Sequence, residues 1–137
     1  MRKVTLGQVI QLDKAVTIPD EWVDLVNPLQ HKYALLLTTN PAIVRFIPTK
    51  HTKVVKYHIQ LSQIEEDFLE KVVSSLQELE VQTLFNSGVC FVETDCYYEF
   101  FIDYPDEEEK VQQVVELLER APGVLGVDST IIEINEG

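Results

Sequence analysis

Residues 64–80, IEEDFLEKVVSSLQELE, carry the pattern that most restricts what this chain can fold into. Their apolar residues recur at spacings of three and four, which places them on one side of an α-helix. The stripe consists of Ile64, Phe68, Val72, Leu76 and Leu79. Ser62, with Glu65 three positions later, is predicted to cap the start of the helix. Such a helix is stable only when its apolar side packs against another element.

Strand-like segments flank this helix and show where that packing surface comes from. A turn at ETD is predicted between the second and third strands, and a bulge or bend at Asn86, Ser87 and Gly88. In chain order the predicted elements are a strand at 54–61, the helix at 64–80, strands at 81–92 and 96–104, a helix at 106–120 whose first turn is acidic, and a strand at 124–134. The order β-α-β-β-α-β is that of a ferredoxin-like fold, with both helices on one face of an antiparallel sheet.

The first fifty residues do not show this pattern; they are predicted to form short strands with one short helix. KVTLGQVIQL and AVTI are predicted strands, and Pro19 ends the second and opens a helix that carries Trp22. KYALLLTT and AIVRFIP are predicted to form a hairpin around Asn40 and Pro41. We therefore expect an α+β protein with two domains, at residues 1–50 and 54–137, joined by the polar stretch between them.

Charge separates the same two parts of the chain. Residues 1–56 contain eight Lys or Arg and four Asp or Glu, a net charge of +4. Residues 57–137 contain three and nineteen, a net charge of −16. The acidic part is expected to repel nucleic acid, whereas the basic part can bind it.

The first part resembles the AbrB/SpoVT swapped-hairpin domain, in the variant found in archaeal phosphate-uptake-regulator-type proteins. The resemblance covers residues 2–50, and TIPDEW is its specific motif. It implies a barrel-like module in which two chains interleave, hence a homodimer that binds double-stranded DNA. Arg2, Lys3 and Lys14 stand at the matching positions and would contact phosphates, although they could equally form a solvated face. Asp20 departs from the pattern, since a basic residue is common at that place in such domains.

The second part, residues 54–135, resembles the ACT-like regulatory domains through ELEVQTLFNSGVCF and LERAPGVLGVD. The resemblance implies pairing of chains through their sheets and binding of a small effector such as an amino acid. The usual Asp-x-Pro-Gly loop is replaced here by LSQIEED, which leaves dimerisation alone as the alternative role. The candidate effector-binding residues are Ser62, Gln63, Ile64, Asn86, Ser87 and Gly88.

No catalytic or metal motif is recognisable. The chain lacks Gly-x-Ser-x-Gly, P-loop and Gly-x-Gly-x-x-Gly patterns, and His31, His51 and His58 do not stand at metal-ligand spacing. The acidic run DYPDEEE is interpreted as a helix start, and Cys90 and Cys96 as reduced thiols that lie diagonally across a turn. We therefore expect no enzyme activity, no cofactor and no metal.

The functional prediction follows from both resemblances. No apolar run approaches the ~20 residues of a membrane span, and no secretory signal is recognisable, so a cytoplasmic protein without a membrane partner is expected. The principal hypothesis is a DNA-binding transcriptional regulator of archaeal or bacterial type, whose C-terminal domain serves regulation or dimerisation. The alternative is a dimer that does not bind DNA and serves protein interaction or the sensing of a small effector.

Overall fold

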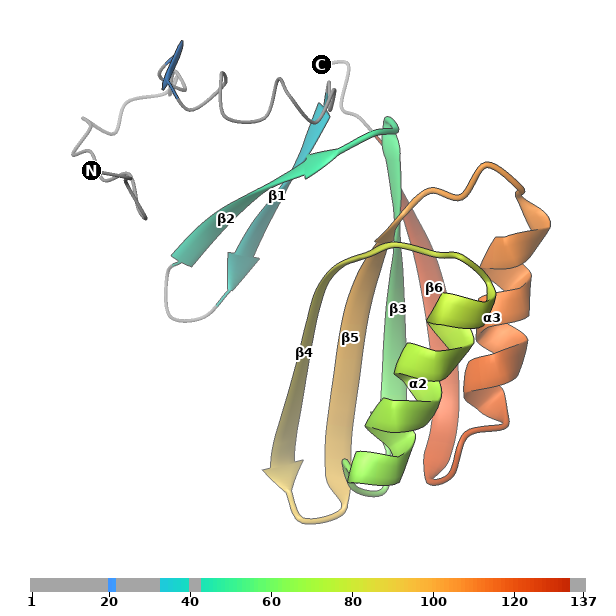
Figure 1. Cartoon of the computed structure of the whole chain (residues 1–137). Helices are drawn as coiled ribbons and strands as arrows, with labels where there is room; N and C mark the ends of the chain where they lie inside the picture. Colours follow the sequence, from blue (N-terminus) through green and yellow to red (C-terminus); the bar gives the residue numbers. More distant parts are fainter. Residues whose placement is uncertain (1–19, 22–32, 40–42, 134–137) are drawn as a thin grey trace, which may run out of the picture. The chain divides into compact units, whose positions relative to one another are not determined.

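A computed structural model of the chain describes residues 20–21, 33–39 and 43–133 (Figure 1). The chain divides into two compact units, Met1–Gln30 and His31–Gly137, and nearly all described residues belong to the second. Asp20 and Glu21 are helical, as the sequence predicts. Of the remaining residues in the swapped-hairpin resemblance, those of the two strands of the closing hairpin are described, whereas residues 1–19 and 22–32, which include Arg2, Lys3 and Lys14, lie outside the described ranges. That barrel and the two-domain boundary stay predictions.

The second unit contains a four-stranded sheet in the order β4-β5-β3-β6, with antiparallel pairing between all neighbours. Its elements are β3 (Lys53–Leu61), α2 (Glu66–Glu78), β4 (Thr83–Val92), β5 (Asp95–Asp103), α3 (Glu109–Glu119) and β6 (Val124–Glu133). Both helices cover the same face of the sheet (Figure 1). This order is that of a ferredoxin-like fold, so the predicted α+β class and element order are confirmed.

The core lies between the helices and this sheet because β3 alternates strictly. Val55, Tyr57, Ile59 and Leu61 are buried against the helices, whereas the residues between them point to the opposite face. The rings of Tyr57 and Phe100 stack with centroids 4.9 Å apart. Helix α2 contributes Phe68, Val72 and Leu76 to the core, and α3 contributes Val114, Val115 and Leu118. The buried Tyr57 hydroxyl donates a hydrogen bond to the Val111 carbonyl at 2.9 Å.

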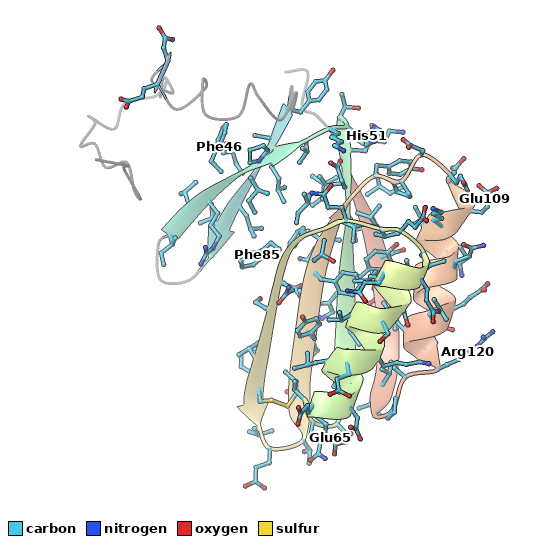
Figure 2. The ribbon with its side chains drawn as sticks, in the orientation of Figure 1. Phe46, His51, Glu65, Phe85, Glu109 and Arg120 are labelled. Atoms are coloured by element: carbon cyan, nitrogen blue, oxygen red, sulfur yellow. A yellow bond between two sulfur atoms is a disulfide. The ribbon has the colours of Figure 1, made fainter. Side chains whose placement is uncertain are left out.

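A separate two-stranded hairpin precedes the ferredoxin-like sheet. It consists of β1 (Tyr33–Thr39) and β2 (Ile43–Thr49), which pair antiparallel with Leu36 opposite Phe46, so both predicted strands are confirmed. One side of the hairpin packs on the sheet face opposite the helices, where Leu35 is buried with Val54 and Phe101. Leu37, Ile47, Leu84 and Phe85 pack around this cluster. Figure 2 labels Phe85 on β4 and Phe46 on the hairpin.

The predicted cap and bulge differ from the structure. Helix α2 begins at Glu66, and its N-cap, Glu65, makes no capping hydrogen bond with its side chain. Ser62 does not cap the helix, because it lies three residues before the N-cap; its backbone N–H is bonded to the Gly123 carbonyl at 3.1 Å. Residues 86–88 form regular strand, and the irregularities of β4 lie between Thr83 and Phe85 and between Cys90 and Val92.

The interpretation of Cys90 and Cys96 as reduced thiols is wrong for this structure, which joins them in a disulfide. Val92 pairs with Asp95 across the turn, so a regular hairpin would place Phe91 opposite Cys96. The register shift that follows Cys90 places Cys90 there instead, with the two Cα atoms 4.0 Å apart. The pair is therefore directly opposed rather than diagonal, and the bond joins β4 to β5 beside their shared turn (Figure 2).

Candidate ligand-binding site on the open face of the sheet

The face of the four-stranded sheet opposite α2 and α3, here called the open face, carries a row of polar side chains. His58 on β3 lies opposite Glu99 on β5 and opposite Asp128 on β6. Ser87 on β4 lies on the other side of Glu99. Because directly opposed residues of neighbouring strands share a face, the row Ser87, Glu99, His58, Asp128 crosses all four strands.

Glu99 holds two basic side chains at the centre of this row. His58 Nδ1 lies 2.7 Å from a Glu99 oxygen, and Lys56 Nζ lies 3.1 Å from the same oxygen. A carboxylate only accepts hydrogen bonds, so Nδ1 carries a proton and Nε2 is the acceptor of the neutral ring. Burial acts to raise the pKa of Glu99, but the hydrogen bonds and charges of His58 and Lys56 outweigh it and hold that pKa below its ordinary value.

Aromatic rings adjoin the histidine on the same face. The Tyr97 ring stacks on His58 with centroids 5.0 Å apart, and Phe91 meets Tyr97 edge-on at 5.9 Å. The hydrogen bond that Asp95 accepts from the Tyr97 hydroxyl raises the pKa of Tyr97, and the negative charge of Asp95 acts in the same direction. Phe91, Tyr97 and Asp95 are thus linked to one another at the end of the β4–β5 hairpin.

These side chains surround a hollow of about 480 Å³. Its lining residues are His58, Ser87, Val89, Phe91, Asp95, Tyr97 and Glu99. A second hollow of about 380 Å³ lies towards β6 and shares His58 and Tyr97 with the first. Phe91 is 70% exposed and Val89 49% exposed, although both are apolar. The first hollow has the size of a small-molecule site, and it combines apolar surface with a few fixed polar groups, as such sites do.

The residues predicted to bind an effector do not gather in this hollow. Ser87 lines it, whereas Asn86 lines a different hollow beside α2. Gly88 faces the helices, where a Cβ atom would lie 2.7 Å from Ile64 Cδ1, so Ile64 and Gly88 are in close contact. Ser62 is bonded to Gly123 through its backbone N–H, and the Gln63 side-chain amide donates a hydrogen bond to the Glu65 carboxylate. An effector role for these residues stays a prediction.

Sequence reasoning missed Phe91, Asp95, Tyr97 and Glu99 as a site. A usable signal was present: in CYYEFF every second residue shares a face, which separates Tyr97 and Glu99 from Tyr98 and Phe100. The structure places Tyr98 and Phe100 on the helix side of the sheet. What the pattern lacked was the register that sets His58 against Glu99.

The acidic run at residues 103–109 has a structural role in the described part of the chain. Asp103 is buried and accepts hydrogen bonds from the backbone N–H groups of Lys50 and His51, at 2.8 and 3.3 Å. His51 Nε2 also lies 3.3 Å from an Asp106 oxygen. Among the described residues, no group of three or more His, Cys, Asp or Glu is placed to hold a metal ion. No helix in those ranges is long and apolar enough to cross a membrane.

Neither the protein families nor the curated proteins provide a match. Among solved structures, the chain is similar to the regulatory subunit of aspartate kinase from Thermus thermophilus in its ligand-free form, with 12% sequence identity and a TM-score of 0.43. The match covers 60% of this chain and 52% of the aspartate kinase subunit, so this chain spans about half the length of that subunit.

Proposed function

We propose that this chain is a dimeric, non-catalytic sensor that binds a small effector on the open face of its ferredoxin-like sheet. One observation carries the proposal, namely the hollow in which Phe91 and Val89 stay exposed beside the fixed polar groups of Glu99 and His58. Contact between large apolar side chains and water is unfavourable in free energy, and a bound ligand would remove these side chains from water. The ligand would lie across β4 and β5.

The polar row supports binding rather than catalysis. Ser87 and His58 lie on either side of Glu99, so two strand spacings, about 10 Å, separate their backbones. A serine nucleophile needs its base within about 3 Å. His58 directs Nδ1 to Glu99, and its ring is held against Tyr97. These contacts fix the imidazole as part of a binding surface, with Nε2 available to accept a hydrogen bond from a ligand.

The outer side of the β1–β2 hairpin supports dimerisation. Leu36 and Val44 are 64% and 65% exposed, and Phe46, opposite Leu36, is 42% exposed. A second copy of the chain would cover this apolar surface. Sedimentation of the variant Val44→Glu is expected to show monomer under conditions in which the unmodified chain is dimeric. An unchanged dimer would exclude this surface as the interface.

DNA binding through Arg2, Lys3 and Lys14 remains a separate proposal, because these residues lie outside the described ranges. Nucleic acid is a poor candidate for the open face, since residues 57–137 carry a net charge of −16.

The experiment that tests effector binding is a fragment screen followed by amide chemical-shift mapping on the full chain. Hits are expected to perturb residues of β4 and β5 and to lose affinity in Phe91→Ala. Leu125→Ala is the matched control, because Leu125 is 62% exposed on β6, outside the hollow, and loses a similar amount of exposed apolar surface. A screen without hits, or hits equally weakened by both substitutions, would remove the basis of the proposal.

A further inference from the structure

From the charges and rings of the hollow we infer the chemical class of its ligand: an organic ammonium ion, in which a protonated amine is attached to a small apolar body. The inference rests on the proposed function and names what the site selects. It depends on two features of the lining, an acidic group without a cationic partner and an exposed aromatic ring next to it.

The first feature is the difference between the two carboxylates of the hollow. Glu99 is neutralised by Lys56 and, when the ring is protonated, by His58. Asp95 accepts a hydrogen bond from the neutral Tyr97 hydroxyl, and within the described part of the chain no basic side chain forms an ion pair with it. A carboxylate can accept several hydrogen bonds, so Asp95 keeps both acceptor capacity and negative charge for a ligand.

The second feature is the position of the rings relative to that charge. Val92 pairs with Asp95 across the turn, so Phe91 and Asp95 occur at the same end of the β4–β5 hairpin and line the same hollow. An ammonium group attracted to Asp95 therefore approaches the rings of Phe91 and Tyr97. A cation within about 6 Å of a ring centroid gains about 0.5–1 kcal/mol at an exposed site. Charge and ring thus favour the same class of ligand.

The rest of the lining fits the remainder of such a molecule. Val89 provides exposed apolar surface, and Ser87 and His58 Nε2 provide hydrogen-bonding groups at the other end. None of the residues that line this hollow is a lysine or arginine. Lys56, on the same face, is directed to Glu99 and to the Phe101 ring. An anionic ligand would have to approach Asp95, which has no basic partner in the described ranges, and the repulsion disfavours it.

Three probes of nearly equal size separate the possibilities: 2-phenylethylamine, neutral 2-phenylethanol and anionic 3-phenylpropionate. We expect titrations followed by amide chemical shifts at neutral pH to give the amine a Kd about tenfold lower than that of the alcohol, from one exposed ion pair and one cation–π contact. The carboxylate is expected to bind weakest. The preference for the amine should fall as salt is added, because exposed ion pairs are screened.

Variants assign the preference to the two features. Asp95→Asn should reduce the preference for the amine over the alcohol from about tenfold to the about two- to fivefold that the cation–π contact alone provides. Phe91→Leu should weaken binding of the amine while it preserves apolar bulk. Asp67→Asn removes the same charge from an exposed position on α2, on the other face of the sheet, and should change neither. Equal binding of amine and alcohol, or an amine preference that Asp95→Asn leaves undiminished, would overturn the ammonium inference and leave effector binding intact. Binding of none of the three probes, together with an empty fragment screen, would overturn both.

Discussion

Breaking the disulfide between Cys90 and Cys96 should loosen the ligand-binding hollow before it disturbs the helices. The residues on either side of each cysteine, Val89 and Phe91 on β4 and Asp95 and Tyr97 on β5, are four of the seven that line the hollow. The bond therefore holds together the two strands that carry most of the site. Cys90 is exposed, so a reductant can reach it, whereas Cys96 is 1% exposed and packs in the core.

The magnitude follows from the length of the closed loop. The two cysteines are separated by 6 positions, so chain-entropy arguments give the bond about 7 cal/mol/K, or about 2 kcal/mol at 25 °C. For a domain of this size, about 4–8 °C of Tm corresponds to each kcal/mol, which predicts a fall of roughly 10 °C on reduction. The chemistry is a two-electron exchange: two equivalents of an external thiol become their own disulfide, while Cys90 and Cys96 each gain a hydrogen.

Calorimetry of the chain with and without a dithiol reductant measures this effect. Cys90→Ser is the appropriate variant, because it changes only the exposed partner and leaves the Cys96 side chain in the core. We expect the variant to melt near the reduced chain and to be insensitive to reductant. At 25 °C, where all forms are folded, the affinity for 2-phenylethylamine should fall in parallel. An unchanged Tm after thiol titration has shown complete reduction would refute the reasoning, because the bond would then restrict nothing in the unfolded chain.

Three further predictions concern the core, the polar row and the contact under Ile64. Tyr57→Phe removes the hydrogen bond to the Val111 carbonyl and should lower the free energy of unfolding by about 1 kcal/mol in denaturant titrations; no loss would mean that the bond is not formed in solution. Because the pKa of Glu99 is lower in the folded protein than in the unfolded chain, its ionised form stabilises the fold at pH values above its unfolded-state pKa. This contribution is lost as the pH falls through the pKa that Glu99 has in the folded protein. Stability measured against pH should therefore decline less towards acid in Glu99→Gln, and parallel profiles would contradict the pairing with Lys56 and His58. Gly88→Ala places a methyl group 2.7 Å from Ile64 Cδ1 and should lower the free energy of unfolding by about 1 kcal/mol, and by less in an Ile64→Val background. In Gly126→Ala the added methyl group meets no atom within 4 Å, so that variant should be neutral or stabilising. Equal effects at both glycines would disprove the close contact.

The fold of residues 53–133 could be predicted because its signals are local. The apolar stripe of α2 repeats with the helical period, and Phe68, Val72 and Leu76 are buried as that period requires. Alternation along β3 and β5 likewise separates core residues from those of the open face. Neither signal requires knowledge of which residue lies opposite which.

The candidate site could not be predicted in the same way, because it depends on register. The contact of His58 with Glu99 joins residues 41 positions apart, and a slip of one position would turn either side chain to the other face. The cysteine pair depends on the irregularity between Cys90 and Val92, which the sequence does not mark with a glycine or proline. Interpretation of the pair as separate thiols assumed a regular turn, and the register shift removed that assumption.

The division of the open face into a covered and an uncovered part gives the strongest reason to expect a ligand. At one end, Val54 and Phe101 are buried, because the β1–β2 hairpin places Leu35 over them. Further along, the polar row is stable in contact with water, since Glu99 is paired with Lys56 and His58. At the far end Phe91 is again apolar but uncovered, and it stands beside an aspartate that has no basic partner in the described ranges. A second copy of the chain would cover Phe91 but would bring another acidic surface to Asp95, so a small cation fits this end better than a protein partner of the same charge.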